Sequence, residues 1–225
     1  VVRVEETATV FGKTWHGLVG IDLDTKPGAY PMTFNAAGQT PIMTTLRVLP
    51  RQFTVRHLRV PPNFVNPPPD ALEQIARDIK KTAEVLQIIS PRHWTGPFVL
   101  PIDGHPTSNF GTRSVYNGQP RSPHAGVDFP GPIGIPIRAA NEGVVVLAEP
   151  LYFTGNTVIV DYGDGLFSLF AHLSEFRAHV GDVVSPDSVV GLVGATGRVT
   201  GPHLHWAVRL QGARVDPVLL VAATQ

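Results

Sequence analysis

The sequence contains no cysteine among its 225 residues. Disulfide bonds and thiolate metal ligands are therefore excluded, and cysteine use says nothing about the redox compartment. No run reaches the roughly 18 apolar residues that a transmembrane helix needs, so we expect no transmembrane segment. The first residues, Val1 to Glu6, lack the basic-then-apolar pattern of a signal peptide. The chain is therefore expected to be a mature or trimmed form.

The sequence also lacks an excess of either charge, with 18 basic and 18 acidic residues and a formal net charge of zero. A division after Ile89 leaves 10 basic and 8 acidic residues before it, and 8 basic and 10 acidic residues after it. Neither part has the basic excess that binding to a phosphate backbone requires. We therefore expect no nucleic-acid partner.

Glycine and proline are abundant, with 22 residues each. Such frequent turn residues are typical of many short strands, so we predict a mainly β fold. Residues 1–66 are predicted to form an immunoglobulin-like β-sandwich. Its strands are expected within Val1–Val10, Thr14–Leu23, Met43–Val48 and Gln52–Val60.

Residues 67–90 are predicted to be a proline-rich linker with one helix. Pro67 to Pro69 stiffen the chain, and apolar residues at helical spacing follow from about Asp70 to Gln87. The apolar stripe, which is expected to pack against the rest of the molecule, comprises Leu72, Ile75, Ala76, Ile79, Ala83 and Leu86.

Residues 91–225 are predicted to form an antiparallel β domain without a second amphipathic helix. Seven of the nine histidines lie here, so any chemistry is expected in this part. The predicted strands are Gly134–Arg138, Gly143–Ala148, Asn156–Val160, Leu166–His172, Val189–Val193 and His203–Leu210.

One motif combines His124 and Asp128, whose side chains are both suitable ligands for a zinc-like ion. A straight strand would hold their Cα atoms about 13 Å apart, which is too far for one ion. Because Gly126 lies between them, we expect a bend or bulge at Ala125-Gly126 to bring the two side chains together.

A second motif contains His203 and His205, which alternate with apolar residues and so share one face of a predicted strand. His172 ends another apolar run and by itself is weak support for a site. A catalytic zinc site needs three protein ligands and a water. His124, Asp128 and one of His203 and His205 could supply those ligands.

His124-Ala125-Gly126-Val127-Asp128 and His203-Leu204-His205 resemble the paired motifs of the lysostaphin-type zinc peptidases. The resemblance covers about Pro101 to Pro217, and Leu18–Asp24 also looks like the β-sandwich that precedes this domain in some bacterial envelope members. Further matching segments are Ser108–Arg113, Gly134–Ala139, Gly155–Asp161, Ala171–Ser174, Gly181–Val184, Gly194–Gly197 and Thr200–Trp206.

The resemblance implies a zinc endopeptidase that cleaves peptide cross-links of peptidoglycan, either between stem peptides or in a glycine-containing bridge. It implies that His124, Asp128 and His205 bind one Zn²⁺ ion, and that His172 and His203 are catalytic. It also implies an extracytoplasmic, most simply periplasmic, location and allows a regulatory protein partner at residues 1–66. Arg113 is a candidate ligand for a substrate carboxylate, because its planar guanidinium suits one.

Three other functions are compatible with parts of the sequence. A catalytically silent wall-binding or hydrolase-regulating module would keep the same fold, and a zinc peptidase acting on glycine-rich proteins would keep the same site. A lipoyl or biotin carrier domain resembles the stretch from Val180 to Gly191, but it needs an acceptor lysine. No lysine follows Lys81, so the carrier function is excluded.

Overall fold

The computed structural model describes residues 2–4, 17–35, 40–61 and 65–225. The fold is mainly β, as predicted, and most of its ladders are antiparallel. No helix in these described residues combines the length and the apolar character needed to cross a membrane.

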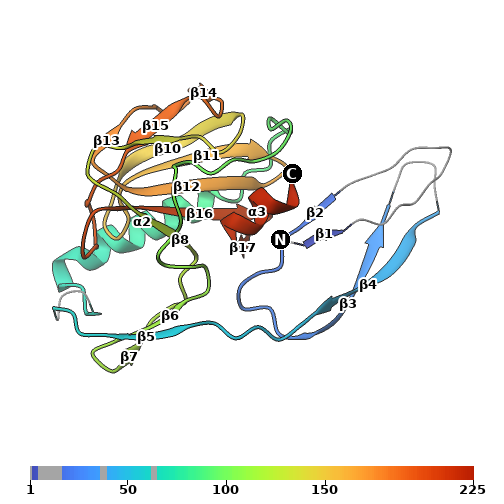
Figure 1. Ribbon diagram of the computed structural model, residues 1–225, viewed down its shortest axis with the longest axis horizontal. Coiled ribbons are helices and arrows are strands. Elements are labelled where there is room, and N and C mark those ends of the chain that lie inside the picture. Colours follow the sequence, from blue (N-terminus) through green and yellow to red (C-terminus); the bar gives the residue numbers. More distant parts are fainter. Residues whose placement is uncertain (1, 5–16, 36–39, 62–64) are drawn as a thin grey trace.

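A seven-stranded sheet forms the centre of the C-terminal part (Figure 1). Its order is β14-β10-β11-β12-β16-β17, and β8 pairs with the first half of β16. The sequence predicted β16 with the bounds that the structure shows. The strands are β8 (Gly126–Pro130), β10 (Gly143–Leu151), β11 (Gly155–Gly163), β12 (Leu166–Leu173), β14 (Val183–Val184), β16 (His203–Leu210) and β17 (Ala213–Val215).

A three-stranded sheet covers one face of the large sheet. Its order is β13 (Glu175–Phe176), β15 (Val189–Leu192) and β9 (Pro136–Arg138). Side chains from both sheets form one buried cluster, which includes Phe129, Ile137, Val190 and Trp206. Each fully buried side chain of this size contributes about 1.5–3 kcal/mol to folding. This core supports β8 and β16, the two strands that carry the paired motifs.

A helix covers the opposite face of the large sheet. A short 3₁₀ turn, η1 (Pro69–Ala71), leads into α2 (Leu72–Val85), which confirms the predicted helix. Its C-terminal end packs on a second buried cluster from the sheet, Leu147, Leu151, Ile159 and Phe167.

The predicted orientation of this helix was only partly right. Ile75 is buried, but Leu72 and Ile79 are 54% and 61% exposed. Polar contacts fix the rotation of the helix instead: Asp78 accepts a hydrogen bond from the Tyr152 backbone at 2.7 Å, and Lys81 pairs with Glu149 at 2.7 Å. Apolar spacing alone does not reveal such pairs.

The expectation of no second helix was wrong, because α3 (Pro217–Ala223) follows β17. Asp216 caps this helix, since its carboxylate accepts a hydrogen bond from the Val218 backbone at 3.1 Å, and Pro217 occupies the first turn. An Asp-Pro pair before an apolar run is a recognised helix start. The uniformly apolar run hid this signal.

The first 66 residues contain β1 (Val2–Val4), β2 (Gly17–Val19), β3 (Gly28–Phe34), β4 (Ile42–Val48) and β5 (Val55–Leu58). β1 pairs with β2 and β3 with β4, and within the described residues these two ladders do not join into a larger sheet. Much of the predicted strand Val1–Val10 lies outside those residues. The immunoglobulin-like sandwich and the domain boundaries at residues 66 and 90 therefore stay predictions.

Contacts on two sides tie this N-terminal part to the C-terminal part. β5 runs parallel to β6 (Arg113–Tyr116), which itself pairs with β7 (Gln119–Pro120). On the other side, the Arg214 guanidinium on β17 donates hydrogen bonds to both carboxylate oxygens of Asp22, at 2.6 and 3.0 Å. Figure 1 shows β5 next to β6 and below β8, and β2 beside α3.

We expect the Asp22–Arg214 pair to make stability depend on pH. The Arg214 side chain holds the pKa of Asp22 well below its ordinary value of 3.8, although partial burial opposes this. A lowered folded-state pKa adds stability that is complete above the unfolded-state pKa and is lost as the pH falls. Asp22→Asn should therefore lower the free energy of unfolding by about 1 kcal/mol at about pH 7, and by less near pH 2. Urea unfolding at both pH values measures the loss of stability in Asp22→Asn. Asp103→Asn, which alters an exposed carboxylate, is the control. An equal loss of stability for Asp22→Asn at about pH 7 and about pH 2 would contradict the prediction.

Candidate metal centre

The pairing of β8 with β16 brings the two motifs together. In this antiparallel ladder Asp128 lies directly opposite His205, and His203 lies opposite Pro130. His124 precedes β8, and its backbone N–H donates to the Thr112 carbonyl at 2.9 Å. Two segments that are far apart in the sequence therefore meet at one end of the large sheet.

Three potential ligand atoms converge at this point. Asp128 Oδ1 lies 3.0 Å from His124 Nε2 and 2.9 Å from His205 Nδ1, and the two nitrogens are 3.0 Å apart. Two imidazoles and one carboxylate are the donor set of a catalytic zinc site with a fourth position for water. His203 Nε2 lies farther from Asp128 Oδ1, at 3.8 Å. The geometry thus favours His205 over His203 as the third ligand.

The side chains of His124 and Asp128 meet, as we expected of a chain that bends at Ala125-Gly126, although the two residues are four positions apart. Gly126 permits the close approach of β8 to β16. A Cβ atom at this position would lie 2.4 Å from the Trp206 carbonyl oxygen and 2.9 Å from the His205 ring. Only glycine fits here without moving a ligand.

Gly126→Ala is therefore expected to disturb the metal centre as well as the fold. Overpacking of this kind typically costs about 1–3 kcal/mol, and the displaced strand should also weaken metal binding. Denaturant unfolding and zinc titration, compared with Gly17→Ala, where no atom lies within 4 Å of the added Cβ, measure both effects. Wild-type stability and zinc affinity in the Gly126 variant would contradict this role.

Backbone carbonyls hold three of the histidines in one tautomer. Nδ1 of His124 lies 3.2 Å from the Asn109 carbonyl, that of His172 2.9 Å from the Thr196 carbonyl, and that of His203 2.9 Å from the Gly201 carbonyl. A carbonyl only accepts hydrogen bonds, so each Nδ1 carries the proton. Nε2 is therefore the ring nitrogen left to bind a metal or exchange a proton, and that of His124 lies 3.0 Å from Asp128 Oδ1.

His172 and His203 lie beside the three ligand atoms. Their ring centroids are 4.8 Å apart, and the His172 ring is 6.0 Å from that of His205. His172 adopts φ +65°, a left-handed conformation that is unfavourable for most side chains. Such strain is often found at functional sites, and here it accompanies a side chain that faces the candidate ligands.

Burial and mutual hydrogen bonding set the charges of these groups. Burial, together with the neighbouring His205 and His203, lowers the pKa of His172 to about 3, so this imidazole is neutral at pH 7. Burial also lowers the pKa of His205, which favours the neutral form that binds metals. Burial raises the pKa of Asp128, but hydrogen bonds with His124 and His205 outweigh this effect and keep it ionised.

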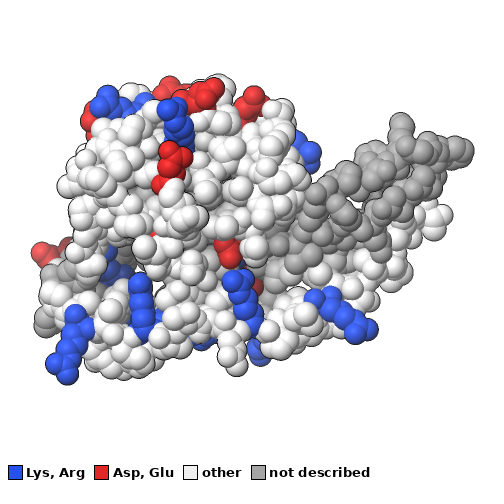
Figure 2. All heavy atoms as spheres, viewed as in Figure 1, with Lys and Arg blue, Asp and Glu red and all other residues white. Residues whose placement is uncertain are grey.

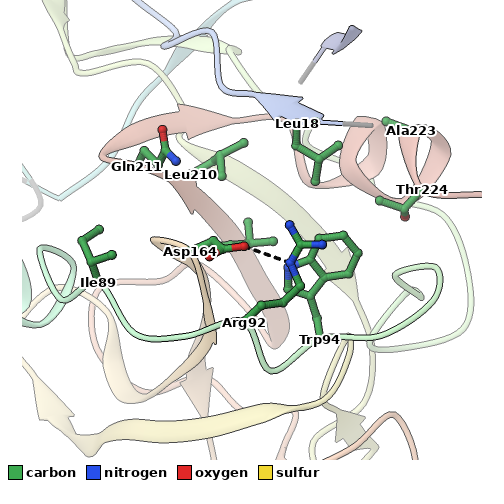
Figure 3. A pocket seen from close by; sticks show the side chains of 11 residues that line it. Leu18, Ile89, Arg92, Trp94, Asp164, Leu210, Gln211, Ala223 and Thr224 are labelled. Carbon is green, nitrogen blue, oxygen red and sulfur yellow. Dashed lines mark hydrogen bonds and ion pairs between the residues drawn. The ribbon is translucent and has the colours of Figure 1, made fainter. Parts of the chain in front are cut away.

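The described residues line, among others, two cavities of about 460 Å³ each. Figure 3 shows the first, remote from the metal centre, where Arg92 pairs with Asp164 at 2.9 Å and lies over the Trp94 ring. The second borders His124 and contains Arg56, Arg121 and Arg198. It is therefore the cavity next to the candidate chemistry.

The structure places Arg113 at the start of β6, with an exposed side chain that does not line this second cavity. It does not join the other predicted site residues, and its substrate role stays a prediction. The cavity arginines and the carbonyls of Asn109, Thr196 and Gly201 carried no sequence signal. Arginines far apart in the sequence have no motif spacing, and every residue has a carbonyl.

Comparison with known proteins matches residues 122–217 to the model of peptidase family M23. A crystal structure of a Pseudomonas aeruginosa protein described as a candidate M23 peptidase is similar to this chain, at 35% identity and a TM-score of 0.76. The match covers 99% of this chain and 84% of that protein. This chain belongs to peptidase family M23, which confirms the resemblance seen in the sequence.

Curated relatives match only the C-terminal part. The DD-carboxypeptidase/endopeptidase Mpg of Neisseria meningitidis is 41% identical over 101 residues, or 45% of this chain and 23% of the relative. The peptidoglycan DD-endopeptidase ShyA of Vibrio cholerae is 39% identical over 111 residues, or 49% of this chain and 26% of the relative. The chain thus spans about a quarter of the length of the curated relatives it matches.

Proposed function

We propose that this chain is a zinc-dependent endopeptidase that hydrolyses peptide cross-links of peptidoglycan. One observation carries the proposal: the ligand atoms of His124, Asp128 and His205 lie within about 3 Å of one another, with His172 and His203 beside them. Two comparisons support it. ShyA is named a peptidoglycan DD-endopeptidase. A structure described as a zinc-containing peptidase from V. cholerae is similar to this chain at 29% identity and a TM-score of 0.52. The match covers 59% of this chain and 40% of that chain.

His124, Asp128 and His205 would hold the ion, and their chemistry fits zinc. The two imidazole nitrogens and one carboxylate oxygen leave a position for water. The carbonyl partner of His124 Nδ1 orients that ring, as is usual for metal-binding histidines. A bound zinc ion lowers the pKa of water to about 7 and so supplies hydroxide at neutral pH.

The neighbouring histidines would move protons and stabilise charge. His172 is neutral with a free lone pair on Nε2, so it can accept a proton from the attacking water and return it to the departing amine. His203 Nε2 faces the same space, and in its protonated form it can donate to the oxyanion that develops on the scissile carbonyl. These are the roles that the resemblance implied for the two residues.

The substrate also suggests a location. Peptidoglycan lies outside the cytoplasm, so we propose an extracytoplasmic and, more specifically, periplasmic protein.

Digestion of purified peptidoglycan tests the proposed function. The full chain should release uncross-linked fragments, which mass spectrometry identifies together with the bond that was cut. A chelator should abolish the release, and added zinc should restore it. Intact cross-links in the presence of one equivalent of bound zinc would reject the proposal and favour the catalytically silent module.

A further inference from the structure

The cavity beside His124 is strongly basic. Its lining contains three arginines, Arg56, Arg121 and Arg198, and among the described residues that form it there is no aspartate or glutamate. Tyr116 and Ser122 add hydroxyl groups to the wall. Because the chain as a whole carries no net charge, this concentration of one sign next to a candidate metal ligand is a local feature.

Each of two arginines is held in place by a contact of its own. Arg56 lies on β5 opposite Ser114 of β6, and its Nε donates to Ser114 Oγ at 2.9 Å. The Arg198 guanidinium lies 4.4 Å from the centre of the Phe153 ring, and its backbone N–H donates to the Phe153 carbonyl at 2.9 Å. The N-terminal part of the chain therefore supplies one wall of the cavity, through the parallel pairing of β5 with β6.

Arg121 and Arg198 are close enough to repel each other. Burial lowers the pKa of Arg198, and the positive charge of Arg121 lowers it further. A carboxylate bound within reach of both guanidiniums would be attracted by both positive charges. Figure 2 shows that Lys and Arg also predominate along the edge of this face where β5, β6 and β7 lie, which would attract acidic ligands.

We propose that this cavity binds a free carboxylate of an acidic peptide substrate, with Arg121 and Arg198 as the primary contacts and Arg56 as the third. A planar guanidinium can bind a carboxylate through two parallel hydrogen bonds. Because His124 lines the cavity, the recognised carboxylate belongs to the part of the peptide that flanks the cleaved bond. The inference rests on the proposed function and assigns to these arginines the role that the sequence suggested for Arg113.

A matched pair of substrates tests this inference. One is a cross-linked stem-peptide dimer with free carboxylates, and the other is the same dimer with those groups converted to primary amides. The full chain should cleave the acidic dimer with a kcat/KM about 10- to 100-fold higher, as expected for one charge-assisted contact. Arg121→Gln should remove that preference by slowing only the acidic dimer, and Arg121→Lys should give an intermediate preference.

Arg177→Gln is the control, because this exposed arginine pairs with Glu175 away from the cavity; it should behave as the wild type. Equal kcat/KM values for the two dimers, or an Arg121→Gln variant that slows both equally, would overturn the inference while leaving the proposed function intact. Cleavage of neither dimer would reject the proposed function. Calorimetry on the wild-type chain would then decide the inference: binding of the acidic dimer alone supports it, and equal or absent binding of both overturns it.

Discussion

His205→Ala is expected to lose bound zinc and peptidase activity together. His205 lies on β16 opposite Asp128, and its Nδ1 is 2.9 Å from the Asp128 carboxylate and 3.0 Å from His124 Nε2. Removal of one ligand from three leaves too few for a catalytic zinc site. Because water would return towards its ordinary pKa of about 15.7 from about 7, turnover should fall by at least about four orders of magnitude.

Metal analysis of the purified full chain and turnover of a cross-linked muropeptide measure the two losses. His179→Ala is a matched control, since this histidine lies outside the centre with a side chain that is 86% exposed. The control should retain about one equivalent of zinc and full activity. Retention of both by His205→Ala would show that the ligand set is wrong and would make His203 the next candidate.

His172→Asn is expected to keep zinc and to lose turnover. His172 Nδ1 is bonded to the Thr196 carbonyl, so only its Nε2 is available for proton transfer. Loss of a general acid or base lowers kcat by about 10²–10⁴-fold. Asparagine is the conservative replacement here, because it tolerates the left-handed backbone that His172 adopts at φ +65°.

Zinc content, kcat and KM of this variant separate the two possible roles of His172. We expect about one equivalent of zinc, a KM near that of the wild type and a much lower kcat. Loss of zinc would instead make His172 a metal ligand or a structural support of the centre. An unchanged kcat would remove it from the catalytic machinery.

The grouping of the candidate site residues was largely predictable, because they lie in short motifs. His124 and Asp128 are four residues apart, and alternation with apolar residues placed His203 and His205 on one strand face. The antiparallel pairing of β8 with β16 then brings the two motifs together. The choice between His203 and His205 could not be made from spacing, since it depends on which ring nitrogen reaches Asp128 Oδ1 in three dimensions.

The features that escaped prediction depend on contacts between distant segments. Arg56 reaches the cavity beside His124 only because β5 pairs in parallel with β6. The rotation of α2 follows from Asp78 and Lys81, whose partners lie about 70 residues later in the chain. No local pattern encodes such pairings, so periodicity gave the helix its position but not the face that it buries.

The most direct test of the account is a zinc titration of the metal-free full chain, with cleavage of a cross-linked muropeptide dimer followed at each point. Activity should rise in proportion to added zinc and reach its plateau at one equivalent, with a single peptide bond of the dimer hydrolysed. Binding of one equivalent without any cleavage would contradict the central claim that this metal centre hydrolyses peptidoglycan peptides.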